Sequence, residues 1–203
     1  MVHADEGRRS RVVVTSDRAL VSALAPVFGR AFVHEPMMCW PMGPGGDLAA
    51  RFTRCFEYFL EMAVPVGIVW LAGEGDGLAV WTAPEQREAW ELHPWDQPQI
   101  LEVAEDGGRR YEAFWKWVAA RDPTEPSWQL DTIAVKPELQ GRGIGRALIE
   151  AWLARARADG TSAFLSTGTP ANVAIYGRCG FHVHDEADAP DDGPRVWFMR
   201  WDP

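Results

Sequence analysis

A glycine-rich segment between an apolar strand and an amphipathic helix constrains this chain more than any other feature. Residues 128–135 suit a β-strand, and after Pro137 the chain continues as Gln-Gly-Arg-Gly-Ile-Gly at residues 140–145. A helix is predicted directly afterwards, because apolar side chains recur at helical spacing until Gly160, where a glycine is expected to end it. The sequence therefore predicts a glycine-rich loop that opens a helix.

Such a loop is suited to bind an anion. The first N–H groups of a helix lack internal partners and the helix dipole adds partial positive charge, while glycines let the backbone approach a ligand closely. A Walker phosphate loop is disfavoured, because Arg146-Ala147 stands where Lys-Ser/Thr is needed. A Rossmann fingerprint is disfavoured as well, since Gly141 and Gly143 supply only its first two glycines.

Length and charge limit the class of protein. A chain of 203 residues fits one α/β domain, and 47% apolar with 24% charged residues is the composition of a folded protein. The formal net charge of −9 argues against nucleic acid as a partner, because such binding needs a basic face. It favours a cationic or amine substrate.

The cysteines and the N-terminus predict a cytoplasmic protein without a metal site. Cys39, Cys55 and Cys179 are odd in number and widely spaced, with no C-x-x-C pair. Residues 1–10 are polar and are expected to form a mobile leader without a signal peptide. No apolar run is long enough for a transmembrane helix, so no membrane partner is expected.

Before the glycine-rich loop, the chain alternates strands and helices. We expect a strand at 11–15, one helix from Ser16 or Asp17 through Arg30, a proline- and glycine-rich loop at 36–46, and a helix at 48–62. A hairpin follows, with strands at 66–72 and 77–82 around a turn at 73–76. Residues 84–126 are interpreted as an insertion over one end of the sheet that contains a helix at 109–120. No repeat or linker divides the chain.

Two ordered motifs carry a family resemblance. After a strand that ends in Ala-Val, Gln140, Gly143 and Gly145 match the Gln/Arg-x-x-Gly-x-Gly/Ala motif, and the strand at 163–167 is followed by Tyr176 and its Tyr-x-x-x-Gly-Phe sequence. The chain resembles the GNAT superfamily of acyl-CoA-dependent N-acyltransferases. The resemblance implies an α/β GNAT fold, with a mixed central sheet flanked by helices in a single domain over residues 11–203.

Within that superfamily, the chain is most similar to the puromycin N-acetyltransferase-like branch. Segments 67–70, 79–85, 125–128 and 193–199 carry this likeness. The branch has Leu-Glu-Thr where this chain has Leu-Ser-Thr, so Ser166 replaces a carboxylate that is credited with catalysis there. An aminonucleoside-like antibiotic is one acceptor that the likeness implies, together with a role in antibiotic resistance.

The resemblance also implies site residues. Acetyl-CoA is the expected acetyl donor, and a bound amine attacks its thioester directly. Tyr176 would protonate the leaving thiolate. The expected cofactor-binding residues are Ile133, Ala134 and Val135 through their main chain, the loop residues Gln140, Gly141, Arg142, Gly143, Ile144, Gly145 and Arg146, and Asn172.

With Ser166 in the carboxylate position, the general base must come from elsewhere. Asp131 is the preferred candidate, because it lies on the strand at 128–135 and is expected to share a face with Gln129 and Ile133. Glu35, His34 and His93 are the rivals.

The sequence does not identify the acceptor or the oligomeric state. Large aromatic side chains would suit a flat acceptor but could equally form core: Trp40, Phe56, Trp81, Tyr111 and Trp115. A small-molecule amine is the expected partner, a protein N-terminus or lysine is an alternative, and so is an inactive CoA-binding module that senses or recruits a ligand. A Rossmann-type oxidoreductase is the least favoured alternative. The chain is expected to be a monomer or a homodimer.

Overall fold

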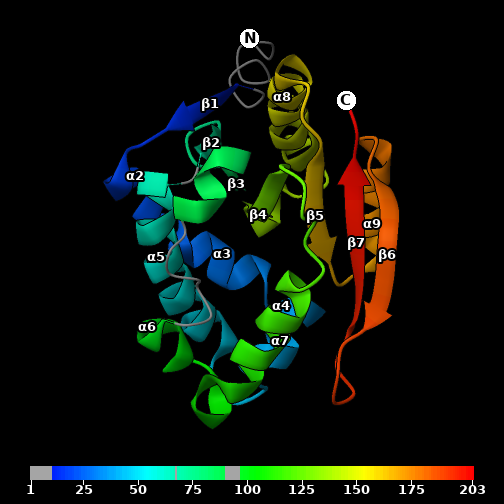
Figure 1. Cartoon of the computed structure of the whole chain (residues 1–203). Helices are drawn as coiled ribbons and strands as arrows, with labels where there is room; N and C mark the ends of the chain where they lie inside the picture. Colours follow the sequence, from blue (N-terminus) through cyan, green and yellow to red (C-terminus); the bar gives the residue numbers. More distant parts are fainter. Residues whose placement is uncertain (1–10, 67, 90–96) are drawn as a thin grey trace.

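Seven strands pair in the order β1-β2-β3-β4-β5-β7-β6 in the computed structural model, which describes residues 11–66, 68–89 and 97–203 (Figure 1). All neighbouring strands are antiparallel except β4 and β5, which run parallel. The strands are β1 (Val12–Thr15), β2 (Ile68–Ala72), β3 (Gly77–Thr82), β4 (Trp128–Val135), β5 (Ala163–Thr167), β6 (His182–Asp188) and β7 (Arg195–Trp201).

Helices cover both faces of this sheet. The α-helices are α2 (Arg18–Ser22), α3 (Ala25–Ala31), α4 (Pro36–Met42), α5 (Leu48–Val66), α6 (Pro98–Leu101), α7 (Arg109–Ala119), α8 (Ile144–Asp159) and α9 (Pro170–Arg178). Short 3₁₀ turns lie at Pro84–Ala89, Glu105–Gly108 and Pro137–Leu139. Figure 1 shows α3, α4, α5 and α7 grouped together in the lower half, with α8 beside β5 and α9 behind β6 and β7.

Side chains of β3 alternate between the two faces of the sheet and pack against helices on both. Leu78 and Val80 pack in the core cluster built by α3 and α5, whereas Ala79 and Trp81 pack in the cluster built by α8. Every residue of β3 is buried, as expected for a strand with helices on both faces. The hairpin of β2 and β3 around residues 73–76 is confirmed.

Two predictions for the N-terminal helices were wrong, and proline explains both. The single helix expected through Arg30 is divided into α2 and α3, because Pro26 has no N–H to donate and is favoured in the first turn of a helix, where it lies in α3, over a helix interior. The loop expected at 36–46 contains α4, which begins at Pro36. Proline is favoured at the first position of a helix, and Gly43, with φ of 86°, then ends α4.

The second half of the chain follows its predicted elements closely. β4 and β5 have the expected bounds, α8 begins at Ile144 and ends at Gly160, whose left-handed backbone caps it, and α7 matches the helix expected at 109–120. The single-domain α/β fold with a mixed sheet is confirmed. Within 84–126, α7 packs against α4 and β5, in a cluster that includes Phe114, Met37 and Phe164.

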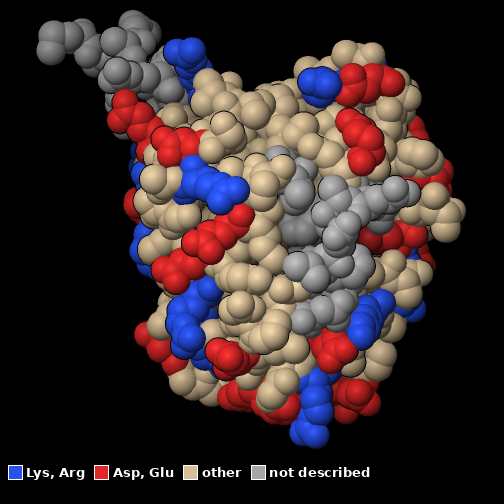
Figure 2. Space-filling model, turned by 60° about the vertical axis from the view of Figure 1, so that its left-hand side comes forward, with Lys and Arg blue, Asp and Glu red and all other residues tan. Residues whose placement is uncertain are grey.

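Charged side chains of both signs are interspersed on the surface. Figure 2 shows this along the two sides of one face, with a band of uncharged side chains between them. Ion pairs spaced i,i+4 contribute to the pattern, among them Arg146 with Glu150 and Arg155 with Asp159 on α8. In the described ranges, no helix is long and apolar enough to cross a membrane.

Candidate active site

The parallel strands β4 and β5 separate soon after they meet. Trp128 pairs with Ala163 and Gln129 with Phe164, and the described residues show no further pairing between these strands. β4 nevertheless continues to Val135, so the edge of β4 that faces β5 carries main-chain N–H and C=O groups without a strand partner. A gap therefore opens at the carboxyl ends of both strands.

A β-bulge in β4 lies at the start of this gap. Leu130 pairs with Trp81 and Thr132 pairs with Val80, so Asp131 is an extra residue opposite β3. A bulge of this kind redirects the side chains that follow it.

The bulge reverses which face of the sheet each residue of β4 occupies. Leu130 packs in the α8 cluster, whereas Ala134, which is also even-numbered, packs in the cluster of α3 and α5. Ile133 packs against the α8 cluster, whereas Asp131 bonds to Thr82, which follows Trp81 in β3 and therefore lies on the other face. Asp131 shares this face with Gln129, which pairs with Thr82, as expected, but not with Ile133, because periodicity alone does not detect an inserted residue.

The bulge also determines which main-chain groups face the gap. Lys136 donates its N–H to the carbonyl of Asp76 on the β3 side, at 3.0 Å. Because main-chain groups alternate along a strand, the N–H groups of Val135 and Ile133 point away from β3, toward β5. Ala134 is turned toward β3, so we exclude its amide from the predicted set of cofactor-binding groups.

The glycine-rich loop lies open to solvent beyond the end of β4. Gly141 and Gly143 have φ of 75° and 80°, a left-handed backbone, and a Cβ atom at either would meet nothing within 4 Å. At Gly145 a Cβ would lie 3.7 Å from a methyl of Val135. The side-chain amide of Gln140 donates to the carbonyl of Val135 at 3.3 Å, which ties the loop to the strand.

The first turn of α8 presents its amides to this open loop. Gly143 is the N-cap, and no side chain caps the helix. Arg142 and Arg146 are exposed beside it, and Arg146 pairs with Glu150 at 2.7 Å. Uncapped amides, left-handed glycines and two arginines form an anion-binding arrangement.

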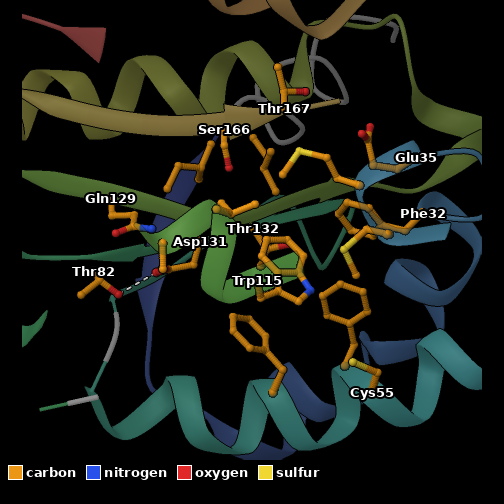
Figure 3. Close-up of a pocket in the computed structure, with 18 of the residues that line it drawn as sticks. Phe32, Glu35, Cys55, Thr82, Trp115, Gln129, Asp131, Thr132, Ser166 and Thr167 are labelled. Atoms are coloured by element: carbon orange, nitrogen blue, oxygen red, sulfur yellow. Dashed lines mark hydrogen bonds between the residues drawn. The ribbon is translucent and has the colours of Figure 1, made fainter. Parts of the chain in front are cut away.

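A cavity of about 560 Å³ lies on the α3 and α5 side of the gap (Figure 3). Its floor is β4, one wall is formed by Ser166 and Thr167 of β5 with Asn172 and Tyr176 of α9, and the opposite walls come from α3, α5 and α7. The volume is typical of a small-molecule site. Aromatic side chains dominate the opposite walls: Phe32, Phe56, Phe59, Tyr111 and Trp115.

Glu35 reaches this cavity from the residue that precedes α4. One oxygen of its carboxylate accepts the N–H of Gly168 at 3.2 Å, and the other accepts the side-chain amide of Asn172 at 3.3 Å. Asn172 also donates to Thr167 at 3.1 Å. Burial raises the pKa of the Glu35 carboxyl, although the bond from Gly168 acts in the opposite direction. A half-buried carboxylate with neutral partners therefore lies at the cavity wall.

Tyr176 lies beside this carboxylate in α9. Its side chain is buried and its ring packs edge-on against Phe181, with 6.0 Å between centroids. Burial raises the pKa of Tyr176, and the negative charge of Glu35 raises it further, so the phenol keeps its proton. Thr169 caps α9 by accepting the N–H of Asn172, which fixes the helix that carries Tyr176.

Asp131 lies on the cavity floor and is more exposed than Glu35. Its carboxylate accepts the hydroxyl of Thr82 at 2.6 Å. Figure 3 shows the pair of Asp131 and Thr82 on one side of the cavity and Glu35 on the other. Of the remaining predicted bases, His34 is exposed and outside the cavity lining, and His93 lies outside the described residues.

The predicted aromatic pocket is right in part. Phe56, Tyr111 and Trp115 line the cavity, but Trp81 and Trp40 do not. Trp81 is fully buried on the α8 side of the sheet, where its ring stacks on Trp152 with centroids 3.5 Å apart.

Trp40 is displaced from the cavity for a different reason. It packs against Phe114 and beneath the guanidinium of Arg110, because α4 directs it toward α7. The cavity residues Phe32 and Asp122 were missed, since only tertiary packing brings α3 and the end of α7 to β4.

The chain is similar to known acetyltransferases in sequence and in fold. Residues 97–183 match the family model described as Acetyltransferase (GNAT) domain. An acetyltransferase structure from Corynebacterium glutamicum, described as histone acetyltransferase HPA2 and related acetyltransferase, superposes with a TM-score of 0.72 and 23% identity over 95% of both chains. The chain has the fold of the GNAT acetyltransferases.

Other proteins with this fold extend the comparison. The Salmonella typhimurium acetyltransferase yncA, solved with its cofactor acetyl-CoA, has a TM-score of 0.54 and 18% identity over 95% of this chain and 92% of its own. A mycothiol acetyltransferase from Streptomyces bingchenggensis is 28% identical over 89% of this chain. This chain spans 62% of the length of that relative.

Proposed function

We propose that this protein transfers an acetyl group from acetyl-CoA to a primary amine of a small molecule. The observation that carries the proposal is the gap between β4 and β5, which runs from the open glycine-rich loop to a cavity containing Glu35 and Tyr176. The match of residues 97–183 to an acetyltransferase domain supports it.

The residues around the gap fit acetyl-CoA. A cradle with room at Gly141 and Gly143, uncapped helix amides and two exposed arginines suits a diphosphate. The N–H groups of Ile133 and Val135 would bind the neutral pantetheine arm or the thioester oxygen. When bound, the cofactor supplies an activated acetyl group as a thioester.

The proposed reaction needs a proton acceptor for the amine and a proton donor for the leaving sulfur. Glu35 takes a proton from the acceptor ammonium, and the freed lone pair of nitrogen forms a bond with the thioester carbon as the carbon–sulfur bond breaks. Tyr176 gives its phenolic proton to the leaving sulfur and recovers one from the nitrogen of the new amide. Glu35 releases its proton to solvent, so the net products are an amide, a thiol and one proton.

We favour Glu35 over Asp131 as the proton acceptor. Glu35 shares a wall with Tyr176, and its hydrogen bonds from Gly168 and Asn172 hold it toward the gap. Asp131 is exposed and bonded to Thr82. A carboxylate whose pKa is raised is also the stronger base.

Two further readings of the acceptor site stay as proposals. The puromycin N-acetyltransferase-like likeness favours an aromatic antibiotic or metabolite amine, and the aromatic wall is compatible with that class. The inactive CoA-binding module is favoured only by Ser166, which lines the cavity without a carboxylate. Thiol release with any amine excludes the inactive module.

Acetyl-CoA is expected to raise the melting temperature. At a ligand concentration 100 times Kd, binding to the folded state alone contributes about 2.7 kcal/mol, or roughly 5–10 °C for a chain of this size. A Gly143→Trp variant should lose this shift, because its side chain fills the space that the diphosphate needs. ATP and NADH at the same concentration should have little effect. The measurement is thermal unfolding with and without each ligand.

Gly160→Trp is the matched control. Gly160 lies at the other end of α8, also has a positive φ of 64° and also has open space around its Cβ. Both variants carry the same kind of backbone strain, yet the two sites are separated by a helix of 16 residues, about 24 Å. If Gly143→Trp keeps the full acetyl-CoA shift, or Gly160→Trp loses it equally, the loop is not the diphosphate site.

A further inference from the structure

The charges that line the cavity are all of one sign. Among the described residues, the lining contains the carboxylates of Glu35, Asp122 and Asp131 and no lysine, arginine or histidine. An acceptor that fills this cavity therefore meets carboxylates and neutral groups. In a partly desolvated site these charges act more strongly than in water.

The charge of Glu35 is not neutralised by its bonding partners. Its hydrogen bonds come from neutral donors, the main-chain amides of Gly168 and Met37 and the side-chain amide of Asn172. A methyl group added at Gly168 would lie 2.6 Å from a carboxylate oxygen of Glu35. The absence of a side chain at Gly168 therefore lets the carboxylate approach the main chain closely. Neutral donors orient the carboxylate and leave its negative charge available to an ammonium.

The part of the cavity wall formed by α3, α5 and α7 is mainly aromatic. The rings of Phe32 and Phe56 lie 5.1 Å apart, and those of Tyr111 and Trp115 lie 6.1 Å apart. Burial raises the pKa of the Cys55 thiol to about 12, and burial also raises that of Tyr111, so neither adds charge. Figure 3 shows Trp115 between Asp131 and Glu35. This wall would contact an apolar body whose ammonium points toward Glu35.

Resting on the proposed transferase activity, we infer that the acceptor is an amine with an aromatic or similar apolar body and no anionic group, and that Glu35 selects it by attracting the ammonium and repelling a neighbouring carboxylate. Free α-amino acids are thereby disfavoured as acceptors. The same residue gives the site both its substrate class and its proton acceptor.

The test compares three acceptors that share a phenyl ring: 2-phenylethylamine, phenylalaninamide and phenylalanine. The first two are expected to be acetylated. Phenylalanine is expected to have a kcat/KM at least about tenfold lower than its amide, because its carboxylate would lie next to that of Glu35. Propylamine is expected to be at least about tenfold poorer than 2-phenylethylamine, since it lacks the ring.

A Glu35→Gln variant separates charge from other effects. The amines differ in their own pKa, but that difference cancels when the ratio of kcat/KM for amide over acid is compared between wild type and variant. We expect this ratio to fall at least about tenfold in Glu35→Gln, because the repulsion is gone. Glu57→Gln is the matched control, since Glu57 is exposed on α5 outside the cavity lining, and its ratio should equal that of wild type.

A second measurement uses wild-type protein only, in case Glu35→Gln is too slow to assay or does not fold. Trimethyl(2-phenylethyl)ammonium should inhibit competitively at least about tenfold better than its uncharged carbon isostere. Equal inhibition by the two, or equal use of phenylalanine and its amide, overturns the inference while leaving the transferase function intact. Loss of turnover with every amine tested would overturn both.

Discussion

Replacing Tyr176 by phenylalanine is expected to lower kcat by about 10²–10⁴-fold and to leave the affinity for acetyl-CoA unchanged. The variant removes only the hydroxyl, whose proton neutralises the leaving thiolate in the proposed reaction. Burial and the charge of Glu35 both raise the pKa of Tyr176, so this proton is present at any pH in ordinary use. Steady-state kinetics together with acetyl-CoA titration provide the measurement.

Tyr58→Phe is the control for this change. Tyr58 lies on α5 outside the cavity lining and donates its hydroxyl to Gln97 at 3.0 Å, so the same atom is removed away from the gap. Its kcat should stay near that of wild type. A Tyr176→Phe enzyme with wild-type kcat would mean that the thiolate leaves without a proton from this residue.

Replacing Glu35 by glutamine is expected to lower kcat/KM for amines by about 10²–10⁴-fold near neutral pH, because an amine with a pKa of about 10 is almost wholly protonated there and loses its proton acceptor. Asp131→Asn is expected to have the smaller effect. If the order of the two variants is reversed, the base is Asp131.

The pH dependence gives a second test of Glu35. Burial places the pKa of its carboxyl above the ordinary value of 4.5, so wild-type kcat/KM should fall as pH drops through this raised pKa, and that limb should be absent in Glu35→Gln. The titratable groups that interact with the charge of Glu35 are the Cys39 thiol and the Tyr176 phenol. Both have raised pKa values and are neutral.

Stability should change in the opposite direction to activity. A folded-state pKa raised above the unfolded one means that folding is favoured below the unfolded pKa and that this contribution is lost as pH rises through the folded pKa. Ionised Glu35 therefore costs stability at pH 8. The melting temperature of Glu35→Gln should exceed that of wild type at pH 8. This difference in melting temperature should disappear near pH 4.

Local sequence predicts the secondary structure around the glycine-rich loop well. The strand at 128–135, the glycine-rich loop and the helix that ends at Gly160 are neighbours in the chain, so propensity and capping act on each of them directly. Gly141 and Gly143 have the positive φ that makes glycine necessary there.

The acceptor side depends on contacts that local patterns do not encode. Glu35 bonds to Asn172, 137 positions away in the chain, and only the packing of α4 against the end of β5 brings them together. The bulge at Asp131 reverses the faces of the residues that follow it. Trp81 was a candidate for the aromatic pocket because of its residue type. Its position in the side-chain alternation of β3 directs it to the other face of the sheet, where it stacks on Trp152.

In the proposed complex, acetyl-CoA lies in the gap between β4 and β5 and extends from the loop at 140–146 to Tyr176. A crystal structure of the protein with acetyl-CoA tests this placement directly. Diphosphate oxygens are expected within about 3 Å of the amides in this loop, and the thioester sulfur is expected beside the Tyr176 hydroxyl. A cofactor bound on another surface, with the gap closed by side chains, would contradict it.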